Sequence, residues 1–311
     1  MADTQTGAPR TATHALDRGD ATLAYDVDGP LPPAGGGRPL VLIGQPMAAS
    51  GFDDLTAEFG DRTVVRYDPR GLGRSTRRDG TIAQDPDVQA DDVHAVIEAV
   101  GGGPVDLFAS SGGAVTALAL VARHPGDVAT LVAHEPPIIG VLPDVELARR
   151  GFAAVRARYA EHGFGAGMAS FIAFTSVRGE ITEAFLAQPP AEPMDPTAFG
   201  LPAEDDGVRD DPLMSGAGDA IVEFVPDVDA LRAAPTRVVF ALGEESAGTF
   251  TARTAEHTAR LLGDEAVVFP SHRLTPAPST RHRRSGLRPR GMRHGRMGCR
   301  TGGPRPPRDR A

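Results

Sequence analysis

This sequence is organised around the segment Val105-Asp106-Leu107-Phe108-Ala109-Ser110-Ser111-Gly112-Gly113-Ala114-Val115. It begins as a short apolar strand, and a run of helix-forming residues continues from it to Arg123. No loop separates the two predicted elements, so a pair of serines lies on the turn between them. The segment therefore predicts a strand that passes directly into a helix.

The turn has small residues two positions before and two positions after its second serine. Ala109, Ser111 and Gly113 fit the pattern small-x-Ser-x-small, which is typical of a nucleophile elbow. The serine of such a turn has a strained backbone, and larger flanking side chains would collide with the turn. This spacing selects Ser111 and not Ser110 as the nucleophile; the alternative is an ordinary Gly/Ser turn. The helix N-terminus would also place N–H groups beside an oxyanion.

The composition argues against several classes of protein. The 311 residues carry a net charge of −9, and no apolar run is long enough to span a bilayer. The first residues form no apolar signal segment, and a single cysteine, Cys299, allows neither an internal disulfide nor a two-cysteine metal spacing. We therefore expect a cytoplasmic protein with no membrane partner, no metal and no cofactor. Five histidines are expected to be surface or capping groups: His14, His94, His124, His162 and His257.

Charge is divided unevenly along the chain. Residues 273–311 contain 12 arginines and one acidic residue, whereas the rest contains 20 basic and 40 acidic residues. An acidic body is a poor candidate for nucleic-acid binding. The basic tail has three interpretations: translation in a shifted reading frame, an arm that binds nucleic acid or an acidic partner, and a neutral disordered extension. In each case we expect residues 275–311 not to form a packed element.

Strands and helices alternate between residues 40 and 133. This pattern predicts a mostly parallel sheet flanked by helices. In such sheets the functional residues gather in the loops at the carboxyl ends of the strands. Gln45, Asp68, Ser111 and Glu135 all lie at such ends in this sequence. We expect the functional site there.

The predicted organisation has five parts. Residues 1–12 form a disordered N-terminus, and 13–140 the first part of an α/β core. Residues 141–230 form an inserted helical cap, with helices over 145–159 and 164–176. Residues 231–272 complete the core, and 273–311 form a disordered tail rich in Arg, Pro and Gly.

Between about Leu40 and His272 the sequence resembles the α/β-hydrolase superfamily. The resemblance is carried by the segment around Ser111, by Asp68-Pro69-Arg70-Gly71-Leu72-Gly73-Arg74-Ser75 and by His134-Glu135-Pro136-Pro137. It implies an α/β-hydrolase fold, and a nucleophile, an acid and a histidine in that order along the chain. We interpret the segment 68–75 as structural, with its glycines forming a turn that Arg70 tethers.

The resemblance also implies an oxyanion hole and a general base. The hole would consist of the backbone N–H groups of Gln45 and Gly112, because Pro46 has no N–H to donate. The base would be His272, which comes one residue earlier than the family pattern. The final helix of the family does not follow His272.

The acid has two candidates, each directly after a predicted strand. Glu245 follows the strand over residues 236–242, and Glu135 follows the strand over residues 128–133. Glu245 is the preferred candidate. For Glu135 the alternative is a buried structural carboxylate bonded to loop backbone.

These features predict a hydrolase that acts on an ester or related acyl compound, a small molecule, by a Ser-His-acid mechanism. Phe164, Met168 and Phe171 would line an apolar acyl pocket, or would form the core of the cap itself. The sequence leaves the oligomeric state open. One alternative is a folded but catalytically impaired protein that at most binds a ligand, since the histidine is displaced and the last helix is missing. Another is perhydrolysis or a lyase reaction by the same serine and histidine.

Overall fold

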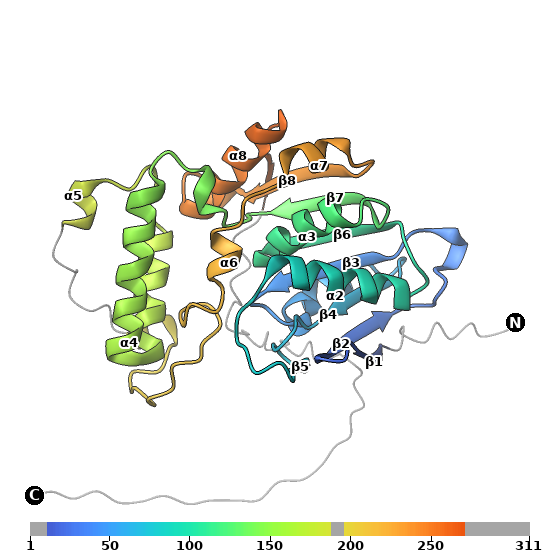
Figure 1. Ribbon diagram of the computed structural model, residues 1–311, viewed down its shortest axis with the longest axis horizontal. Helices are drawn as coiled ribbons and strands as arrows, with labels where there is room; N and C mark the ends of the chain where they lie inside the picture. The colour runs from blue at the N-terminus through green and yellow to red at the C-terminus, as the bar shows by residue number, and fades with distance from the viewer. Residues whose placement is uncertain (1–10, 188–195, 271–311) are drawn as a thin grey trace, which may run out of the picture. The chain divides into compact units, whose positions relative to one another are not determined.

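A computed structural model describes residues 11–187 and 196–270. They form a nine-stranded sheet flanked by helices (Figure 1). The strands are β1 (Ala12–Asp17), β2 (Ala21–Asp28), β3 (Leu40–Gln45), β4 (Val64–Tyr67), β5 (Thr76–Arg77), β6 (Val105–Ser111), β7 (Val128–His134), β8 (Arg237–Gly243) and β9 (Val267–Phe269). The helices are α1 (Asp53–Ala57), α2 (Pro86–Ala99), α3 (Gly112–Arg123), α4 (Val145–Thr175), α5 (Glu183–Leu186), α6 (Asp219–Val222), α7 (Val228–Ala233) and α8 (Phe250–Leu262).

The sheet is parallel except at one edge. Its strand order is β1-β2-β4-β3-β6-β7-β8-β9, and β5 pairs with β2. All pairs from β4 to β9 are parallel, whereas β2 is antiparallel to β1, β4 and β5. Parallel strands need crossover connections, whose helices cover the sheet and bury its strands on both faces. This architecture confirms the predicted fold class, a mostly parallel sheet flanked by helices.

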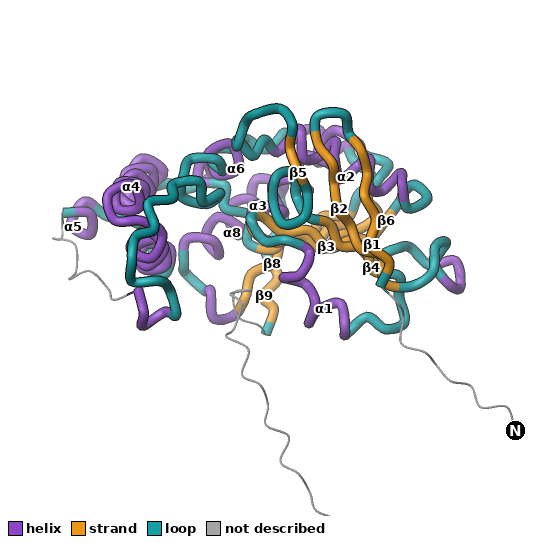
Figure 2. Tube along the Cα trace, turned by 90° about the horizontal axis from the view of Figure 1, so that it is seen from below, coloured by secondary structure: helices purple, strands orange, loops and turns teal. Residues whose placement is uncertain are grey.

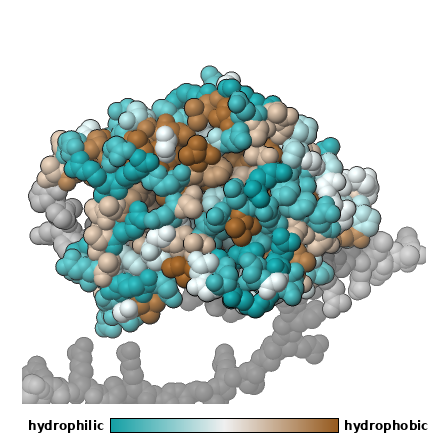
Figure 3. Space-filling view, viewed as in Figure 1, coloured by the Kyte–Doolittle hydropathy of each residue, from teal (hydrophilic) through white to brown (hydrophobic). Residues whose placement is uncertain are grey.

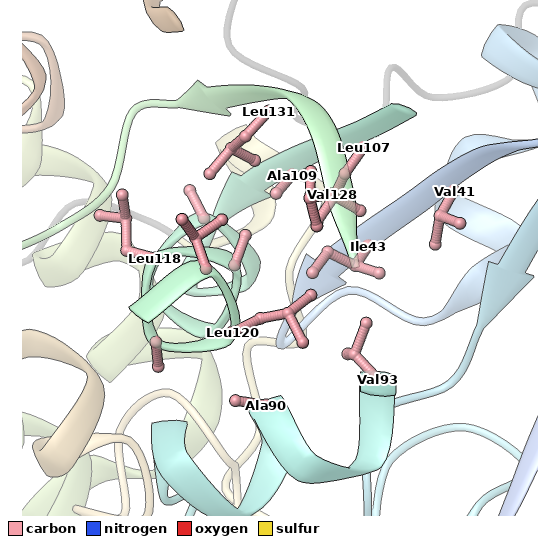
Figure 4. Packing of buried hydrophobic residues seen from close by; sticks show 14 of the residues in the cluster. Val41, Ile43, Ala90, Val93, Leu107, Ala109, Leu118, Leu120, Val128 and Leu131 are labelled. Atoms are coloured by element: carbon pink, nitrogen blue, oxygen red, sulfur yellow. The ribbon is translucent and has the colours of Figure 1, made fainter. Parts of the chain in front are cut away.

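The larger hydrophobic core lies between the sheet and helices α2 and α3 (Figure 4). Strand residues of alternating position point to this side, as the two-residue period of a strand requires. The helix α3 is buried around most of its circumference, from Gly112 to Val121. The following members of this core are at most 1% exposed: Val41, Ile43, Leu107, Ala109, Leu118 and Leu120. The layer that carries Ser111 is therefore tightly packed.

The opposite face of the sheet has a smaller cluster. Figure 2 shows α1 on the side of the sheet away from α2. A cavity of about 530 Å³ lies on the α1 face, and its lining includes Leu42, Phe108, Val132 and Phe269. Among the described helices, α1 alone contributes to this lining.

The segment between β7 and β8 contains helices α4 to α7. Its longest helix, α4, joins the two helical stretches that the sequence predicts, and it breaks at Gly163, where φ is 79° and ψ is −172°. The two halves pack against each other, because a Cβ at Gly151 would lie 2.2 Å from the ring of Phe174. A residue larger than glycine at position 151 would separate them. None of the described helices is both long and apolar enough to cross a membrane.

A buried ion pair joins α4 to α8. Asp144 precedes α4 and pairs with the guanidinium of Arg253, and its Oδ2 also accepts the N–H of Ile181 at 2.6 Å. Burial opposes ionisation of Asp144, but these hydrogen bonds prevail and hold the pKa of its carboxyl below the usual range. The start of the segment is thereby anchored to the helix that follows β8.

Candidate active site

Ser111 is the last residue of β6 and directly precedes α3. Its φ of 56° and ψ of −128° lie outside the regions that non-glycine residues favour. Among the described non-glycine residues, only Ser111 and Glu135 have a positive φ. A buried strand and a buried helix hold this conformation on either side. The turn thus has the strained backbone that the sequence predicts.

Small residues follow Ser111 because the start of α3 touches the end of β3. A Cβ at Gly113 would lie 2.8 Å from the Cα of Gly44 and 2.8 Å from the carbonyl oxygen of Ile43. A Cβ at Gly112 would lie 3.0 Å from the Cβ and Cγ of Gln45. Larger side chains would push α3 away from the sheet.

Gln45 and Gly112, the two predicted oxyanion donors, lie next to Ser111. Gln45 is the Cα partner of Ser111 in the parallel pairing of β3 with β6. Gly112 follows Ser111 directly and begins α3. The structure therefore brings together three of the predicted site residues at the carboxyl end of the sheet.

A chain of buried amide side chains surrounds Gln45. Its Nε2 donates to Oε1 of Gln84 at 2.9 Å, and Nε2 of Gln89 donates to the same oxygen at 2.7 Å. Thr116 of α3 donates to Oε1 of Gln89 at 3.1 Å, and the N–H of Gln84 donates to the carbonyl of Ala217 at 2.7 Å. Gln84 thus connects β3, α2 and the segment between β7 and β8, and Gln89 extends the network to α3.

Sequence reasoning missed this amide network. Its only sequence signal is a pair of glutamines five positions apart, on either side of the residue where α2 begins, and this pattern is common on surfaces. Gln84 is 3% exposed and Gln89 1% exposed, so the network depends on how the helices pack. Buried side-chain amides need partners, and Gln84 and Gln89 find theirs in this network, whereas Oε1 of Gln45 accepts no hydrogen bond from the described residues.

Glu135 lies directly after β7 and has a φ of 48°. It is 4% exposed. Its Oε1 accepts the N–H of Gly243 at 3.1 Å, and its Oε2 accepts the hydroxyl of Thr251 at 2.7 Å. The N–H of Glu135 donates to the carbonyl of Ala241 at 2.9 Å. This carboxylate therefore links the ends of β7 and β8 to α8.

Glu245, the preferred acid, lies in a different environment. It belongs to a 3-10 turn, Glu244–Ser246, that directly follows β8, and it is exposed. Its carbonyl accepts a hydrogen bond from Nη2 of Arg178 at 2.8 Å, which ties the turn to the chain after α4. Both candidate acids thus lie at carboxyl ends of neighbouring strands, one buried and one exposed.

His272, the predicted base, lies outside the described residues, as do residues 1–10 and the tail from 273 onward. The described chain ends after β9, whose last residue is Phe269. Since β9 pairs in parallel with β8, the chain leaves the sheet at the same edge as Glu245. The predicted disorder of the two ends is not addressed by the structure.

A second imidazole lies near the elbow, on the other side of the sheet. Nδ1 of His134 is 3.2 Å from Oγ of Ser110, and Nε2 is 3.9 Å from Oε1 of Glu135. Burial lowers the pKa of His134, and the nearby carboxylate of Glu135 opposes this effect. Ser110 and Ser111 are successive strand residues and point to opposite faces, so His134 approaches Ser110 from the cavity side. This contact was not predicted.

The loop after β4 has the contacts of a structural element. Oδ1 of Asp68 accepts the N–H of Ala49 at 2.7 Å, and Oδ2 accepts the N–H of Arg74 at 3.0 Å. The guanidinium of Arg70 binds both carboxylate oxygens of Asp92, at 2.8 and 2.7 Å. These bonds agree with the interpretation that Arg70 tethers the loop.

The three predicted pocket residues lie on the second half of α4 and are half-buried. Phe171 packs against Phe152 of the first half, with ring centroids 6.3 Å apart. Met168 and Phe164 lie about one and two turns earlier on the same helix. None of the three lines the cavity on the α1 face.

Comparison with known proteins identifies a protein family that this sequence matches. A model of the alpha/beta hydrolase fold matches residues 47–201. The uncharacterized hydrolase YraK of Bacillus subtilis (strain 168) is 36% identical over 85 residues, which are 27% of this chain and 31% of YraK. The match thus spans less than a third of the length of that relative.

Solved structures show the same fold at low sequence identity. One, from a study of carboxylesterases of Nitrososphaera gargenis, has a TM-score of 0.54 and 18% identity, over 83% of this chain and 89% of that chain. An esterase from Thermogutta terrifontis has a TM-score of 0.55 and 19% identity, over 83% and 89%. The chain belongs to the α/β-hydrolase superfamily.

Proposed function

We propose that this protein hydrolyses an ester or a related acyl compound, with Ser111 as the nucleophile. The observation that carries the proposal is the strained backbone of Ser111 at the start of α3, beside Gln45 and Gly112. The names of the similar structures, carboxylesterases and an esterase, support the same class of reaction.

In the proposed reaction, Oγ of Ser111 attacks the carbonyl carbon and His272 takes the hydroxyl proton. The carbonyl electrons move onto oxygen, and the N–H groups of Gln45 and Gly112 stabilise this oxyanion, each by about 3 kcal/mol. Collapse of the tetrahedral intermediate expels the alcohol, which takes the proton from His272. Water then attacks the acyl group on Ser111 and releases the acid by the same steps.

We propose Glu245 as the acid that orients His272. Glu245 lies after β8, at the edge where the chain also leaves β9 toward His272. Glu135 is the alternative, and its bonds to Gly243 and Thr251 suit a structural carboxylate. Glu245→Gln should lower kcat about 100-fold or more without changing the free energy of unfolding. If Glu135→Gln alone lowers kcat to this extent, the assignment passes to Glu135.

We propose that the segment between β7 and β8 caps the site and contacts the acyl group. Figure 3 shows hydrophobic residues gathered over the upper part of α4 and the chain beside it, whereas most of this face is hydrophilic. Phe164 and Met168 are the half-buried side chains of α4 that we assign to substrate. Phe171 packs within α4 and would contribute through its exposed edge.

Labelling by a fluorophosphonate probe tests the nucleophile. The probe should modify the full chain at Ser111, and Ser111→Ala should abolish both labelling and turnover of p-nitrophenyl butyrate. Ser110→Ala is the matched control, because Ser110 points to the other face of the sheet, and it should retain labelling. His272→Ala should abolish turnover, whereas His134→Gln should retain it. Unchanged turnover in Ser111→Ala would refute the proposal.

The second candidate is a folded protein that is catalytically impaired and binds a ligand at most. The cavity on the α1 face favours it, since the described helices leave its apolar lining partly uncovered. A chain that unfolds cooperatively but does not react with the fluorophosphonate probe would support this candidate.

A further inference from the structure

Two histidines are stacked on the α2–α3 side of the molecule. His94 belongs to α2 and His124 directly follows α3, and their ring centroids are 4.0 Å apart with planes inclined by 5°. Asp127, directly before β7, lies beside them. One ligand atom from each of these three residues lies within 4.8 Å of the other two. Three separate elements thus bring three metal-binding side chains together.

Each imidazole contacts a carboxylate through one nitrogen. Nδ1 of His94 is 2.7 Å from Oδ2 of Asp127, and Nε2 of His124 is 2.8 Å from Oδ1 of Asp91. In the part of the chain that the structure describes, the second nitrogen of each ring has no hydrogen-bond partner. Histidines that bind metals characteristically have one nitrogen on the ion and the other on a carboxylate or carbonyl, and His124 has this arrangement, with Nε2 on Asp91 and Nδ1 left for an ion.

The backbone around the cluster is well anchored. The N–H of His124 donates to the carbonyl of Leu120 at 2.7 Å, and the N–H of Asp127 donates to the carbonyl of His124 at 3.1 Å. The carbonyl of Asp127 accepts the N–H of Val105 at 2.8 Å. The three side chains are 35%, 25% and 12% exposed for His94, His124 and Asp127. An ion from solvent can reach them, and their backbones are held in place.

We propose that His94, His124 and Asp127 bind a divalent transition-metal ion such as Zn²⁺, with Asp91 orienting His124. Two imidazoles and one carboxylate, with water as a fourth ligand, are a common set for Zn²⁺. The ion takes the place of the proton between His94 and Asp127, and Nδ1 of His124 is the third ligand. Ligand atoms of a tetrahedral Zn²⁺ lie about 3.4 Å apart, and binding therefore requires the two parallel imidazoles to rotate out of their stack so that a nitrogen of each faces the ion. This site differs from the sequence-based expectation of no metal.

The site is distant from the candidate nucleophile. Asp127 precedes β7, whereas Ser110 pairs with His134 at the other end of that strand. Seven residues of strand span about 20 Å, which excludes direct contact between the ion and a substrate on Ser111. The ion would instead link α2, α3 and the start of β7. These elements pack around the strand and the helix between which Ser111 lies. Its role is to stabilise the fold, and the proposal is independent of the proposed hydrolysis.

Titration of the chelator-treated full chain with Zn²⁺ by calorimetry tests the site. We expect one ion per chain and a rise in melting temperature. Co²⁺ should give the visible absorption of a tetrahedral complex, which Zn²⁺ removes. His94→Gln/His124→Gln and Asp127→Asn should each weaken binding at least tenfold. Asp91→Asn should weaken it about tenfold, as expected for a residue that orients a ligand.

Two controls distinguish Zn²⁺ binding at this site from Zn²⁺ binding by other side chains of the protein. His162→Gln changes an exposed histidine outside the cluster and should bind Zn²⁺ like the unaltered chain. Replacement of His282, His294 and Cys299 by serine should also preserve binding. The proposal is overturned if the unaltered chain binds no Zn²⁺, or if this triple replacement abolishes binding. It is also overturned if the variant His94→Gln/His124→Gln binds Zn²⁺ as tightly as the unaltered chain while circular dichroism shows that the variant is folded. If that variant does not fold, Asp127→Asn and Asp91→Asn decide in its place.

Discussion

Gly113 lies in direct backbone contact with Gly44, because a Cβ at Gly113 would come 2.8 Å from the Cα of Gly44. This contact sets the start of α3 against the end of β3. It thereby places Ser111 beside Gln45, its partner in the parallel pairing of β3 with β6. The geometry of the candidate site depends on two glycines that carry no chemistry of their own.

Gly113→Ala should destabilise the protein by about 2 kcal/mol, because the added methyl group overpacks a contact between two backbones. Urea unfolding followed by circular dichroism measures this change. Gly126→Ala is the matched control, since no atom lies within 4 Å of a Cβ at that position. It should change the free energy of unfolding by less than about 0.5 kcal/mol. Equal effects of the two substitutions would contradict the prediction.

Ser111→Gly should be more stable than Ser111→Ala by about 1 kcal/mol. Glycine adopts a positive φ without the steric cost that a Cβ imposes, whereas alanine retains this cost. Both variants remove the hydroxyl, so both should be inactive toward a p-nitrophenyl ester. Urea unfolding of the two variants supplies the comparison. A more stable alanine variant would show that the backbone of Ser111 is not strained.

Gln84→Leu should lower both stability and the proposed activity. It removes the oxygen that accepts hydrogen bonds from Gln45 and Gln89, and each unpaired buried donor costs about 1–3 kcal/mol. If Gln45 contributes to an oxyanion hole, kcat should fall more than KM rises. Gln89→Leu is the comparison, because it leaves the bond between Gln45 and Gln84 intact. It should lower stability to a similar extent and kcat less; the reverse order would argue against a positioning role for Gln84.

His134→Gln should reduce the loss of stability on acidification. Burial lowers the pKa of His134 below its ordinary value of 6.5, so the unfolded chain takes up a proton there before the folded chain does. Stability is therefore complete above about pH 6.5 and falls as the pH drops toward the folded-state pKa, by at most about 1.4 kcal/mol per pH unit from this residue. Urea unfolding between pH 8 and 5 should show a smaller decrease for His134→Gln. Identical pH profiles would mean that this imidazole does not contribute.

Most of the fold could be predicted from local patterns. The continuous apolar run at residues 40–43 predicts a strand buried on both faces, and the small residues around Ser111 predict a strained turn. Both features appear in the structure. The two helices predicted over 145–159 and 164–176 are present, but their union in one broken helix depends on Gly163. Hydrophobic periodicity predicts a helix, whereas it does not predict how two helices join.

The site could be predicted only in part. Ser111 and Gln45 end adjacent strands whose order follows from the fold, and Gly112 directly follows Ser111, so their proximity was foreseeable. The contact of His134 with Ser110 and the stack of His94 on His124 involve residues 24 and 30 positions apart, with no shared motif. Such contacts depend on strand register and on helix packing, which the local sequence does not encode.

By itself, this sequence determined the class of fold and the strained serine, because apolar periodicity and small-residue spacing act over a few positions. Tertiary structure alone decided which polar side chains meet. The amide network around Gln84 and the stacked histidines beside Asp127 exist because helices and strands distant in sequence pack at contact distance. The physical reason is the distance in sequence over which each interaction acts. Backbone conformation depends mainly on residues a few positions away. A site forms when segments distant in sequence bury their surfaces against one another.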